Sequence, residues 1–594
     1  MREPVPQTLL QGCGLPQAWR DKPAWRVLNT DFHQGLRFLN TWQTWRSDAK
    51  RPRLLHYVAL REHPPSVDAI LQAAAPYPEL HALAQELAQE CHGLAVGFHR
   101  ISLNEGRVLL TLCVGDTQTL LREQQFAADS VVWDPSESAA EAFRWTLKAL
   151  TRCCRRGTLV VTAQAQSPAQ SAWLVQCGFR VAINGPSTQW SYDPSWELKT
   201  TRNPELARSM LPSPASDCVV IGAGLAGASV AAALAKRGWH VQVLDAGATP
   251  AAGASSLPVG LMVPHVSADD NPRSQLSRSG IRMSLQQAKS LMKSGQDWAM
   301  SGVLEHRELG VSTLWHSQAG WIKPAQLVNA WLAQAGIRFV PNAVVAAVRR
   351  EGDVWVLHNA AGQALAQASH VVFANGWGAQ ALLDDLQIAA PELGPNLARL
   401  PALQGIRGVL SWGMQQPGQA STLPAFPVNG LGSLICNIPL DGETESAAQA
   451  QAWYAGATYE TGTLVNAPVS AHHQANLDKL RTLLPAAAQA LGPAFATGQV
   501  QTWQGTRCVT PDRLPVVGPL DAGASPRLWI SAAMGSRGLS YAVLCAELLA
   551  AQMGGEPWPL PASLARHLSA LRSNDRARLP TVKQGGISDG IIHP

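Results

Sequence analysis

The sequence feature that most restricts the fold is a glycine turn between an apolar strand and a helix, in "CVVIGAGLAGASVAAALAKRG" (218–238). Gly222 permits a tight turn, Gly224 lets the backbone approach a pyrophosphate, and Gly227 lets the helix pack closely on the strand. Asp245 follows the next predicted strand, where a carboxylate accepts hydrogen bonds from a ribose hydroxyl. This order of elements predicts a dinucleotide-binding unit, and a purely structural glycine turn is the alternative.

Segments downstream of the glycine turn identify the dinucleotide. A small-residue loop, "AAGASSLPVGLMVP" (251–264), comes first, and a further strand ends in "HVVFANG" (370–376). "GTRCVTPDRLPVVGP" (505–519) and "MGSRGLSYAVLCAELLA" (534–550) lie near the C-terminus. Together these segments resemble the flavoproteins of the D-amino-acid oxidase and glycine oxidase class, over nearly all of residues 217–570. The resemblance implies an FAD-binding Rossmann domain with an interleaved mixed-sheet substrate domain.

The same resemblance assigns further cofactor-binding positions outside the glycine turn. They lie in the small-residue loop, in the β-rich stretch 344–359, at the end of "HVVFANG", and in the C-terminal turn that closes over the isoalloxazine. These positions are Ala254, Ser255, Val345, Asn375, Gly376, Gly535, Gly538 and Leu539. The cysteines and histidines show no metal-ligand spacing, so no metal is expected.

The chemistry of this flavoprotein class suggests roles for two arginines. Such an enzyme takes hydride from a carbon next to an amine, and its main task is to orient that carbon against the flavin. A carboxylate on the same carbon is best held by a bidentate arginine. Arg507 matches the position that has this role in glycine oxidase-like proteins, and a salt bridge to Asp512 is its alternative. Arg537, between Gly535 and Gly538, contacts flavin or substrate or shapes the turn.

The first half of the chain alternates predicted strands and helices. Apolar runs such as 55–60 and 108–114 are the expected strands, with helical patterns such as 141–153 between them. This alternation indicates an α/β fold with a mostly parallel sheet. A stretch with three prolines and no apolar periodicity separates the halves. The predicted organisation is a domain at 1–199, a linker at 200–216, a flavin domain at 217–575 and a disordered tail at 576–594.

Segments in both halves also resemble the MnmC family of bifunctional enzymes that modify the tRNA wobble uridine. They include "GWIKPAQLVNAWL" (320–332), "GATYE" (456–460) and "GLPQAWRDKPAWRVLNTDFHQGLRFLNTWQTW" (14–45). In that family the flavin half removes the carboxymethyl group of 5-carboxymethylaminomethyl-(2-thio)uridine at tRNA position 34. A methyltransferase half with a Rossmann-like fold then methylates the exposed amine with S-adenosylmethionine. The resemblance implies tRNA as a partner and FAD as a cofactor, with Arg507 on the carboxylate of the N-linked glycine.

The first half departs from the family at its methyltransferase turn. The family pattern is an acid followed by Thr-Gly-Phe-Gly-x-Gly-Leu-Asn-Phe-Leu. Here Asn29 replaces the acid, and Asp31 and His33 replace the first two glycines. Arg37 replaces the asparagine, and of the three glycines only Gly35 remains. Because the backbone must approach the methionine part of the cofactor, these side chains are expected to crowd it.

Two other positions of the methyltransferase site are changed as well. The second strand should end in an acid for the ribose, but Arg61 is there, and Glu62, displaced by one residue, is expected on the opposite face. Asp134 remains as the candidate catalytic residue of this half, but "WDPSESAAEAF" (133–143) lacks the residues that frame the substrate amine. We therefore expect an inactive methyltransferase-like domain without S-adenosylmethionine, kept for tRNA binding or for supporting the flavin domain. Residual activity through an altered loop is the alternative.

The charge pattern agrees with a tRNA substrate. A net charge of +5 permits a polyanionic partner without demanding one. Between residues 20 and 61, nine basic residues stand against three acids, interleaved with Trp19, Trp25, Trp42 and Trp45. Basic side chains can hold phosphate and indoles can stack on bases. A solvated basic face over core tryptophans is the alternative.

The sequence also bears on location and on rival functions. Ten cysteines without a CxxC pair indicate reduced cysteine, and the N-terminus lacks the pattern of a signal peptide, so a cytoplasmic protein is expected. The uncharged segment 218–235 is long enough for a membrane helix, but its glycines lie where a turn needs them. One rival is a fully bifunctional enzyme that also methylates the amine. The other is an oxidase of free glycine or sarcosine. The sequence does not indicate the oligomeric state.

Overall fold

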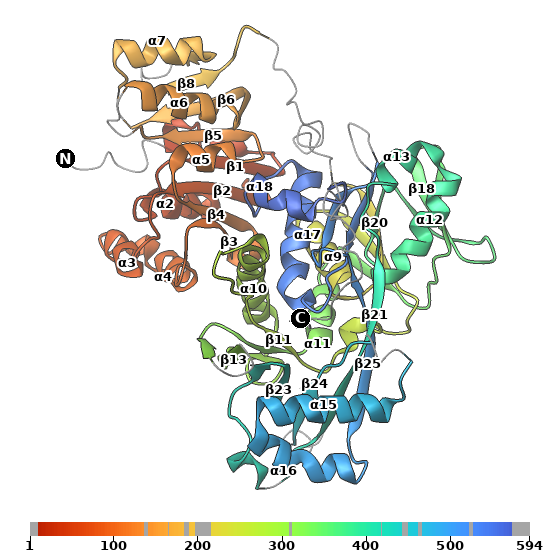
Figure 1. Cartoon of the computed structure of the whole chain (residues 1–594). Helices are drawn as coiled ribbons and strands as arrows, with labels where there is room; N and C mark the ends of the chain where they lie inside the picture. Colours follow the sequence, from red (N-terminus) through yellow and green to blue (C-terminus); the bar gives the residue numbers. More distant parts are fainter. Residues whose placement is uncertain are drawn as a thin grey trace, which may run out of the picture.

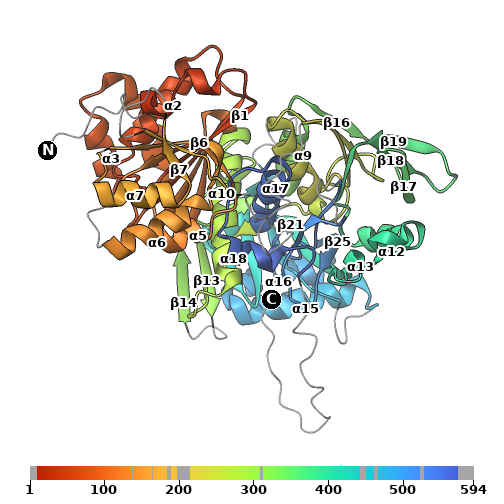
Figure 2. The same cartoon turned by 90° about the horizontal axis from the view of Figure 1, so that it is seen from above.

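The computed structural model describes residues 10–135, 140–163, 165–182, 189–196, 215–307, 312–416, 418–441, 450–460, 466–521 and 527–572. Of the predicted linker at 200–216, only the last two residues fall within these ranges, and the predicted tail at 576–594 lies outside them. The N-terminal half, up to residue 196, and the C-terminal half, from residue 215, lie side by side (Figures 1 and 2).

An eight-stranded sheet forms the centre of the N-terminal half, in the order β3-β4-β2-β1-β5-β6-β8-β7. Its strands are β1 (Ala24–Asn29), β2 (Leu54–Arg61), β3 (Gly97–Leu103), β4 (Val108–Val114), β5 (Ala128–Trp133), β6 (Cys154–Thr162), β7 (Phe179–Val181) and β8 (Gln189–Tyr192). Neighbours from β4 to β6 are parallel, which confirms the expected mostly parallel sheet. The strand order reverses at β1 and β5, so the carboxyl ends of these strands form the expected ligand edge.

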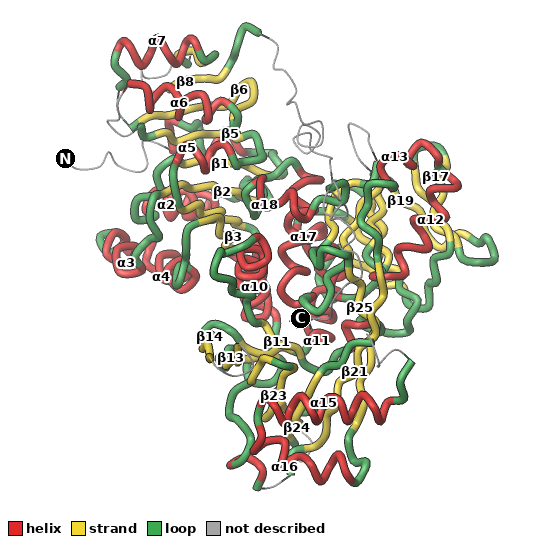
Figure 3. The backbone as a smooth tube through the Cα atoms, viewed as in Figure 1, coloured by secondary structure: helices red, strands yellow, loops and turns green. Residues whose placement is uncertain are grey.

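Helices cover both faces of this sheet (Figure 3). They are α2 (Leu36–Ser47), α3 (Val67–Ala74), α4 (His81–Glu90), α5 (Thr117–Arg122), α6 (Ala140–Thr151) and α7 (Pro168–Gln176). Val27 and Tyr57 belong to the core on one face of the sheet, and Leu28 and Val58 belong to the core on the other. Successive residues are therefore buried on opposite faces, which explains why these strands are continuously apolar in sequence.

The C-terminal half contains a six-stranded sheet in the order β16-β10-β9-β20-β27-β26. Its strands are β9 (Asp217–Ile221), β10 (His240–Leu244), β16 (Ile337–Val340), β20 (His370–Phe373), β26 (Val516–Pro519) and β27 (Leu528–Ala532). All neighbours are parallel except β26 and β27. The core on one face is shared by α9 (Leu225–Lys236), α10 (Pro272–Leu291), α11 (Pro324–Leu332) and α17 (Gly538–Gly554). The predicted strand, glycine turn and helix at 218–238 are confirmed.

A seven-stranded mixed sheet in the order β14-β13-β22-β23-β24-β21-β25 forms the second body of this half. Its strands are β13 (Val303–Arg307), β14 (Ser312–His316), β21 (Gln404–Met414), β22 (Val428–Gly430), β23 (Gly432–Pro439), β24 (Gln451–Gly456) and β25 (Gln501–Val509). Helices α15 (Val469–Leu483) and α16 (Pro485–Ala496) pack on it. This sheet is the mixed-sheet domain expected from the flavoprotein resemblance.

Smaller elements complete the C-terminal half. They are the sheet of β11 (Gly260–Met262), β12 (Trp298–Ala299) and β15 (Gly320–Ile322), the sheet of β17 (Ala347–Glu351), β18 (Val354–His358) and β19 (Ala364–Ala368), and the helices α12 (Ala379–Ala389), α13 (Gly394–Leu397) and α18 (Ala562–Ala565). No helix within the described ranges has both the length and the hydropathy of a membrane span.

Buried charged side chains, which we call the interface cluster, join the two halves. Arg237 at the end of α9 pairs with Glu556 (Nε to Oε2, 2.8 Å) and with Glu547 of α17 (Nη2 to Oε2, 2.9 Å). From the N-terminal half, His56 of β2 lies 3.5 Å from Glu556, and Arg100 of β3 donates to a backbone carbonyl just beyond α17. Burial alone would raise the pKa of Glu556, but Arg237 and His56 together lower it well below its usual range. The carboxylate of Glu556 therefore stays ionised inside the interface.

Candidate active site

The glycine turn lies at the carboxyl edge of the six-stranded sheet. Gly222 has a φ of +104°, and a Cβ there would lie 2.8 Å from the carbonyl oxygen of Ala374. A Cβ on Gly227 would lie 1.8 Å from the carbonyl oxygen of Gly222, so only glycine allows this approach of helix and turn. Gly224 directly precedes α9, whose first N–H groups face an incoming anion. The three glycines therefore leave a cradle that side chains would fill, which fits the pyrophosphate of FAD.

Asp245 and Ser255 already form hydrogen bonds with this turn. The Oδ2 atom of Asp245 accepts from the N–H of Ala223 (2.6 Å), and its Oδ1 atom accepts from the N–H of Gly247 (2.7 Å). Each carboxylate oxygen retains a lone pair for a ribose hydroxyl. The hydroxyl of Ser255 accepts from the N–H of Leu225 at 2.9 Å, at the N-terminus of α9. Binding of a phosphate there requires that this hydrogen bond be shared or broken.

Four more of the predicted cofactor residues lie in loops or at the starts of short 3-10 helices of the same half. Asn375 and Gly376 follow β20, and Gly376 has a φ of +62°. The Oδ1 atom of Asn375 is buried without a hydrogen-bond partner in the described part of the chain, so a ligand donor would satisfy it. Ala254 lies against the backbone of β25. Val345 is partly buried just before β17.

The C-terminal turn brings the last three predicted cofactor residues close to α9, β11 and β25. Gly535 has a φ of +59° and donates its N–H to the carbonyl oxygen of Cys508 in β25 (2.9 Å). A Cβ on Gly538, the first residue of α17, would lie 3.0 Å from the side chain of the first residue of α9. Leu539 is buried against β11. The fold thus gathers distant segments near one helix end, and the cofactor roles of these residues stay predictions.

Arg507 is a half-buried cation without an acidic partner among the described residues. Its guanidinium stacks on Tyr459, with 4.9 Å between Cζ and the ring centroid. Its Nη1 atom is buried and has no hydrogen-bond partner in the same residues. A Cβ on Gly408 of β21 would lie 3.0 Å from this nitrogen, so glycine makes room for the guanidinium. The alternative salt bridge to Asp512 is not formed, because Asp512 is bound by Arg572 at 2.9 and 3.0 Å.

Tyr459 is held in place through both of its neighbours. The Thr458 N–H donates to β21 (3.0 Å), and the Thr458 hydroxyl bonds to Nδ1 of His472 (2.7 Å). The Glu460 N–H donates to the carbonyl of Arg407 (2.9 Å), and the two side chains form an ion pair of 2.6 Å. The aromatic face that Arg507 contacts is therefore fixed. Sequence reasoning quoted this segment for the family resemblance but missed Tyr459.

A second cation, Lys479 of α15, lies close to Arg507. Its Nζ atom donates to the carbonyl oxygen of Ala457 (3.0 Å), two residues before Tyr459. Burial lowers the pKa of Lys479, and the neighbouring Arg507 lowers it further. Within the described residues neither cation has a carboxylate partner, so this part of the site can take an anion. No sequence pattern marks Lys479, which occupies an ordinary position on an amphipathic helix.

Arg537 directly precedes α17 and is itself half-buried. Burial lowers the pKa of its guanidinium, the nearby Tyr541 opposes this effect, and Arg273 adds to it. The hydroxyl of Tyr541 is also buried, without a hydrogen-bond partner in the described ranges. The guanidinium of Arg537 forms no hydrogen bond or ion pair with any described residue, so the turn is shaped by its backbone. This leaves a contact with flavin or substrate as the open prediction for Arg537.

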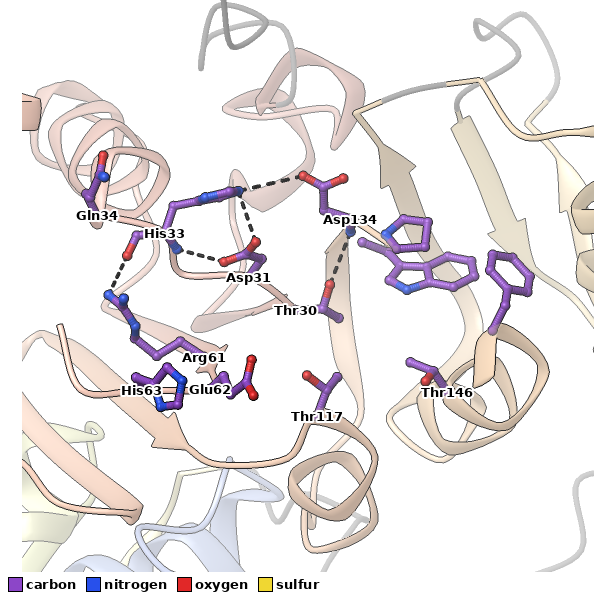
Figure 4. A pocket seen from close by; sticks show the side chains of 13 residues that line it. Thr30, Asp31, His33, Gln34, Arg61, Glu62, His63, Thr117, Asp134 and Thr146 are labelled. Atoms are coloured by element: carbon purple, nitrogen blue, oxygen red, sulfur yellow. Dashed lines mark hydrogen bonds and ion pairs between the residues drawn. The ribbon is translucent and has the colours of Figure 1, made fainter. Parts of the chain in front are cut away.

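The N-terminal half has a separate cavity of about 450 Å³ at the carboxyl edge of its sheet (Figure 4). Asp31 and His33 line this cavity rather than fill it. The Nε2 atom of His33 lies 3.0 Å from Asp31 and 3.8 Å from Asp134, and Arg37 pairs with Asp134 at 2.9 Å. The nearby His33 lowers the pKa of Asp134 in spite of burial, and Arg37 lowers it further. The candidate catalytic carboxylate thus already contacts an imidazole and a guanidinium of its own domain.

The expectation that Glu62 faces away from this cavity is wrong. Because β2 ends at Arg61, the alternation of a strand no longer applies at the next residue, and both side chains line the cavity. Arg61 also donates to the carbonyl oxygen of His33 (2.6 Å), which fixes the altered turn (Figure 4). A carboxylate is therefore present beyond β2, one position later than in the family pattern.

The tryptophans of the basic run are core residues, which corrects the idea that they stack on bases. Trp19, Trp25, Trp42 and Trp45 have exposed fractions of 8% or less. The indole N–H of Trp19 donates to Asp48 (2.8 Å). All four belong to the apolar core on one face of the N-terminal sheet. The alternative, a basic face over core tryptophans, is correct for these side chains.

Comparison with known proteins identifies the family. A family model described as FAD dependent oxidoreductase matches residues 217–310 and 303–552. The tRNA 5-methylaminomethyl-2-thiouridine biosynthesis bifunctional protein MnmC of Albidiferax ferrireducens is 52% identical over 97% of this chain and 97% of its own. The chain belongs to the MnmC family. A second MnmC protein, from Polaromonas sp., is 45% identical over 95% of this chain and 93% of its own.

Membership of the MnmC family confirms the predicted family and the FAD-dependent oxidoreductase class of the C-terminal half. Among solved structures, glycine oxidase from Geobacillus kaustophilus covers 57% of this chain and 95% of its own, with 18% identity and a TM-score of 0.42. The match to MnmC proteins extends over both halves, so the N-terminal half is part of the family unit.

Proposed function

We propose that this MnmC-family chain is an FAD-dependent oxidoreductase that acts on the wobble uridine of tRNA. It removes the carboxymethyl group of 5-carboxymethylaminomethyl-(2-thio)uridine and leaves the 5-aminomethyl group. The observation that carries this proposal is Arg507, a half-buried cation without an acidic partner in the described residues, on a strand that contacts the loops of the cofactor cradle. The family name supports tRNA as the substrate, because the MnmC relatives are named for a tRNA wobble nucleoside.

The site accounts for the reaction through positioning of the substrate. The substrate arm is an N-linked glycine, so its carboxylate is attached to the carbon that is oxidised. Arg507, aligned by Tyr459, binds that carboxylate through two parallel hydrogen bonds and thereby orients the neighbouring carbon. A bound FAD supplies the hydride acceptor. Hydrolysis of the resulting imine by water releases glyoxylate and leaves the aminomethyl group on the base.

A direct assay tests this function. The purified, flavin-containing chain is incubated with tRNA that carries the carboxymethylaminomethyl group, and glyoxylate and the wobble nucleoside are measured. We expect one glyoxylate for each aminomethyl nucleoside formed. Failure of the flavin-loaded chain to release glyoxylate from this tRNA would contradict the proposal.

Replacement of Gly227 by alanine is expected to prevent FAD binding. The new Cβ would lie 1.8 Å from the carbonyl oxygen of Gly222, so the helix must move away from the pyrophosphate site. The measurement is the flavin content of the purified protein from its visible absorbance. Gly492→Ala is the matched control, because its Cβ in α16 would meet no atom within 4 Å. Full flavin content in Gly227→Ala would show that the cradle does not hold the cofactor.

Replacement of Tyr459 by leucine is expected to raise KM for the modified tRNA with little change in kcat. Loss of the aromatic face removes a cation–π contact and frees the Arg507 guanidinium, which corresponds to roughly a three- to thirtyfold change in KM. Tyr459→Phe keeps the ring and should behave like the unsubstituted chain. Equal effects of the leucine and phenylalanine variants would mean that the hydroxyl, rather than the ring face, matters.

We further propose that the N-terminal half no longer binds S-adenosylmethionine. The turn that should present bare backbone to the cofactor carries Asp31 and His33, which join with Asp134 across the cavity. Arg37 adds a cation at Asp134, where the substrate amine, itself cationic when protonated, would have to approach. These residues do not fit the cofactor, and the methyl step is left to another protein.

A fully bifunctional enzyme is the second candidate function. It is favoured by the cavity of about 450 Å³ that remains at this edge of the sheet, which includes Asp134 and Glu62. The MnmC relatives, which match over both halves of the chain, also carry the word bifunctional in their name. A binding measurement with S-adenosylmethionine separates the two candidates, and its expected result is argued below.

A further inference from the structure

Exposed basic side chains gather at the end of the N-terminal sheet opposite its cavity. They come from the segment just before β1 and from the stretch between the last turn of α2 and β2. These segments lie side by side because Ala24 and Leu54, the first residues of the parallel strands β1 and β2, are paired. The hydrogen bond from Trp19 to Asp48 ties the two segments together. We call these residues the basic ridge: Arg20, Lys22, Arg46, Lys50, Arg51 and Arg53, all of them exposed.

The basic ridge carries most of the net charge of the molecule. Within its two segments, six basic residues stand against Asp21 and Asp48, a net charge of +4 where the whole chain has +5. In the described part of the chain none of the six forms an ion pair. Some exposed arginines elsewhere are paired, such as Arg278 with Asp270 at 3.0 Å. The ridge is therefore a concentrated positive surface that the protein does not neutralise itself, and it attracts an external polyanion.

The surroundings of the ridge favour a nucleic acid backbone as that polyanion. A protein interface is usually centred on apolar anchor residues, and binding to a membrane surface is strengthened by apolar side chains that insert. Among the described residues, the exposed large apolar side chains all lie outside residues 20–53. The four tryptophans nearby are buried, so bases have no aromatic platform there either. What remains is charge alone, which binds phosphates without regard to sequence.

We propose that the basic ridge binds the phosphate backbone of the tRNA, away from the nucleotide that is modified. None of the six residues belongs to the cofactor cradle or lines the N-terminal cavity, so their contacts are with other parts of the tRNA. This inference rests on the proposed tRNA substrate. It gives the N-terminal half a task that does not need its altered methyltransferase turn.

The test neutralises three ridge residues whose loss should not disturb the fold. The variant is Arg20→Gln/Arg46→Gln/Lys50→Gln in the full, flavin-loaded chain. Arg51 is kept because it stacks on Trp45 (4.8 Å), and Arg53 is kept because it contacts the C-terminal half near residue 238. The matched control is Lys293→Gln/Arg338→Gln/Arg350→Gln, which removes three exposed cations from the C-terminal half.

The readout is the Kd for tRNA at several salt concentrations, together with kcat at saturating tRNA. We expect the ridge variant to bind tRNA roughly ten- to hundredfold more weakly near physiological salt. The slope of log Kobs, the observed association constant, against log salt should become less negative by about two to three. Its kcat, flavin content and Tm should match those of the parent chain and of the control variant.

Other outcomes separate the two proposals. An unchanged Kd and salt slope in the ridge variant would overturn the ridge assignment, as would an equal loss in the control variant. An acidic protein or a membrane as the true partner of the ridge would give that same unchanged Kd for tRNA. A parent chain that neither binds nor oxidises the modified tRNA would instead overturn the proposed function.

Discussion

Replacement of Arg507 by alanine is expected to lower kcat/KM for tRNA carrying the carboxymethylaminomethyl group by roughly a hundred- to thousandfold, the loss of two charge-assisted hydrogen bonds. The Nη1 atom of Arg507 is buried and has no hydrogen-bond partner among the described residues. In the alanine variant, water at this position binds the substrate carboxylate more weakly than the guanidinium does. The measurement is glyoxylate release under steady-state conditions with purified modified tRNA.

Two comparisons make this result specific. Arg507→Lys keeps the charge but cannot form two parallel hydrogen bonds, so its kcat/KM should fall between those of the parent and the alanine variant. Flavin content should stay constant in both variants, because Arg507 contacts Tyr459 and lies outside the glycine cradle. An alanine variant with the parent kcat/KM would mean that the carboxylate is bound elsewhere. Oxidation of free glycine as fast as of modified tRNA would favour the amino-acid oxidase.

S-adenosylmethionine is expected to give no binding heat with the full chain, even at millimolar concentration. His33 and Arg37 occupy the Asp134 carboxylate, and the side chain of Asp31 stands where the family has bare backbone. A second carboxylate, that of the methionine part, would have to approach Asp31 in a half-enclosed site where like charges repel strongly. The measurement is isothermal titration, with S-adenosylhomocysteine as a second ligand.

The cellular consequence of this prediction can be measured on tRNA. Cells in which this chain alone acts on the wobble uridine should accumulate the 5-aminomethyl nucleoside and not its methylated product. Mass spectrometry of wobble nucleosides from a strain lacking the chain, complemented with it, reports both. Micromolar binding of S-adenosylmethionine that is lost in Asp134→Asn would show that the N-terminal half is still a methyltransferase.

Sequence patterns predicted the parts of the fold that depend on interactions between residues close together in the chain. The glycine turn at 222–227 follows from steric limits on a few neighbouring residues, and the strands β1, β2 and β4 follow from apolar runs that need cover on both faces. These features require no knowledge of distant residues. The segments that resemble known flavoproteins likewise predicted the FAD-dependent oxidoreductase class, which the family match confirms.

The parts that the sequence did not predict depend on contacts between distant segments. Lys479 lies beside Arg507 only because α15 packs on the sheet that contains β25, and its sequence position looks like any solvated helix face. The burial of Trp19 and Trp45 was undecided because a basic run reads alike whether its tryptophans point inward or outward. The direction of the Glu62 side chain was predicted wrongly because it depends on where β2 ends, and no residue pattern marks that end in the sequence.

Strand β2 contacts two different parts of the molecule, the interface cluster near its start and the N-terminal cavity at its end. Near its start, His56 takes part in the charge balance of Glu556, in a cluster that also includes α17, the helix that Arg537 precedes. At its other end, Arg61 contacts the turn around His33, and both residues line the N-terminal cavity. Substitutions can therefore accumulate at the carboxyl end of the strand while its start stays bound to the flavin half. An N-terminal half without methyltransferase activity, as proposed above, would still contribute buried charged contacts to the flavin half through the start of β2.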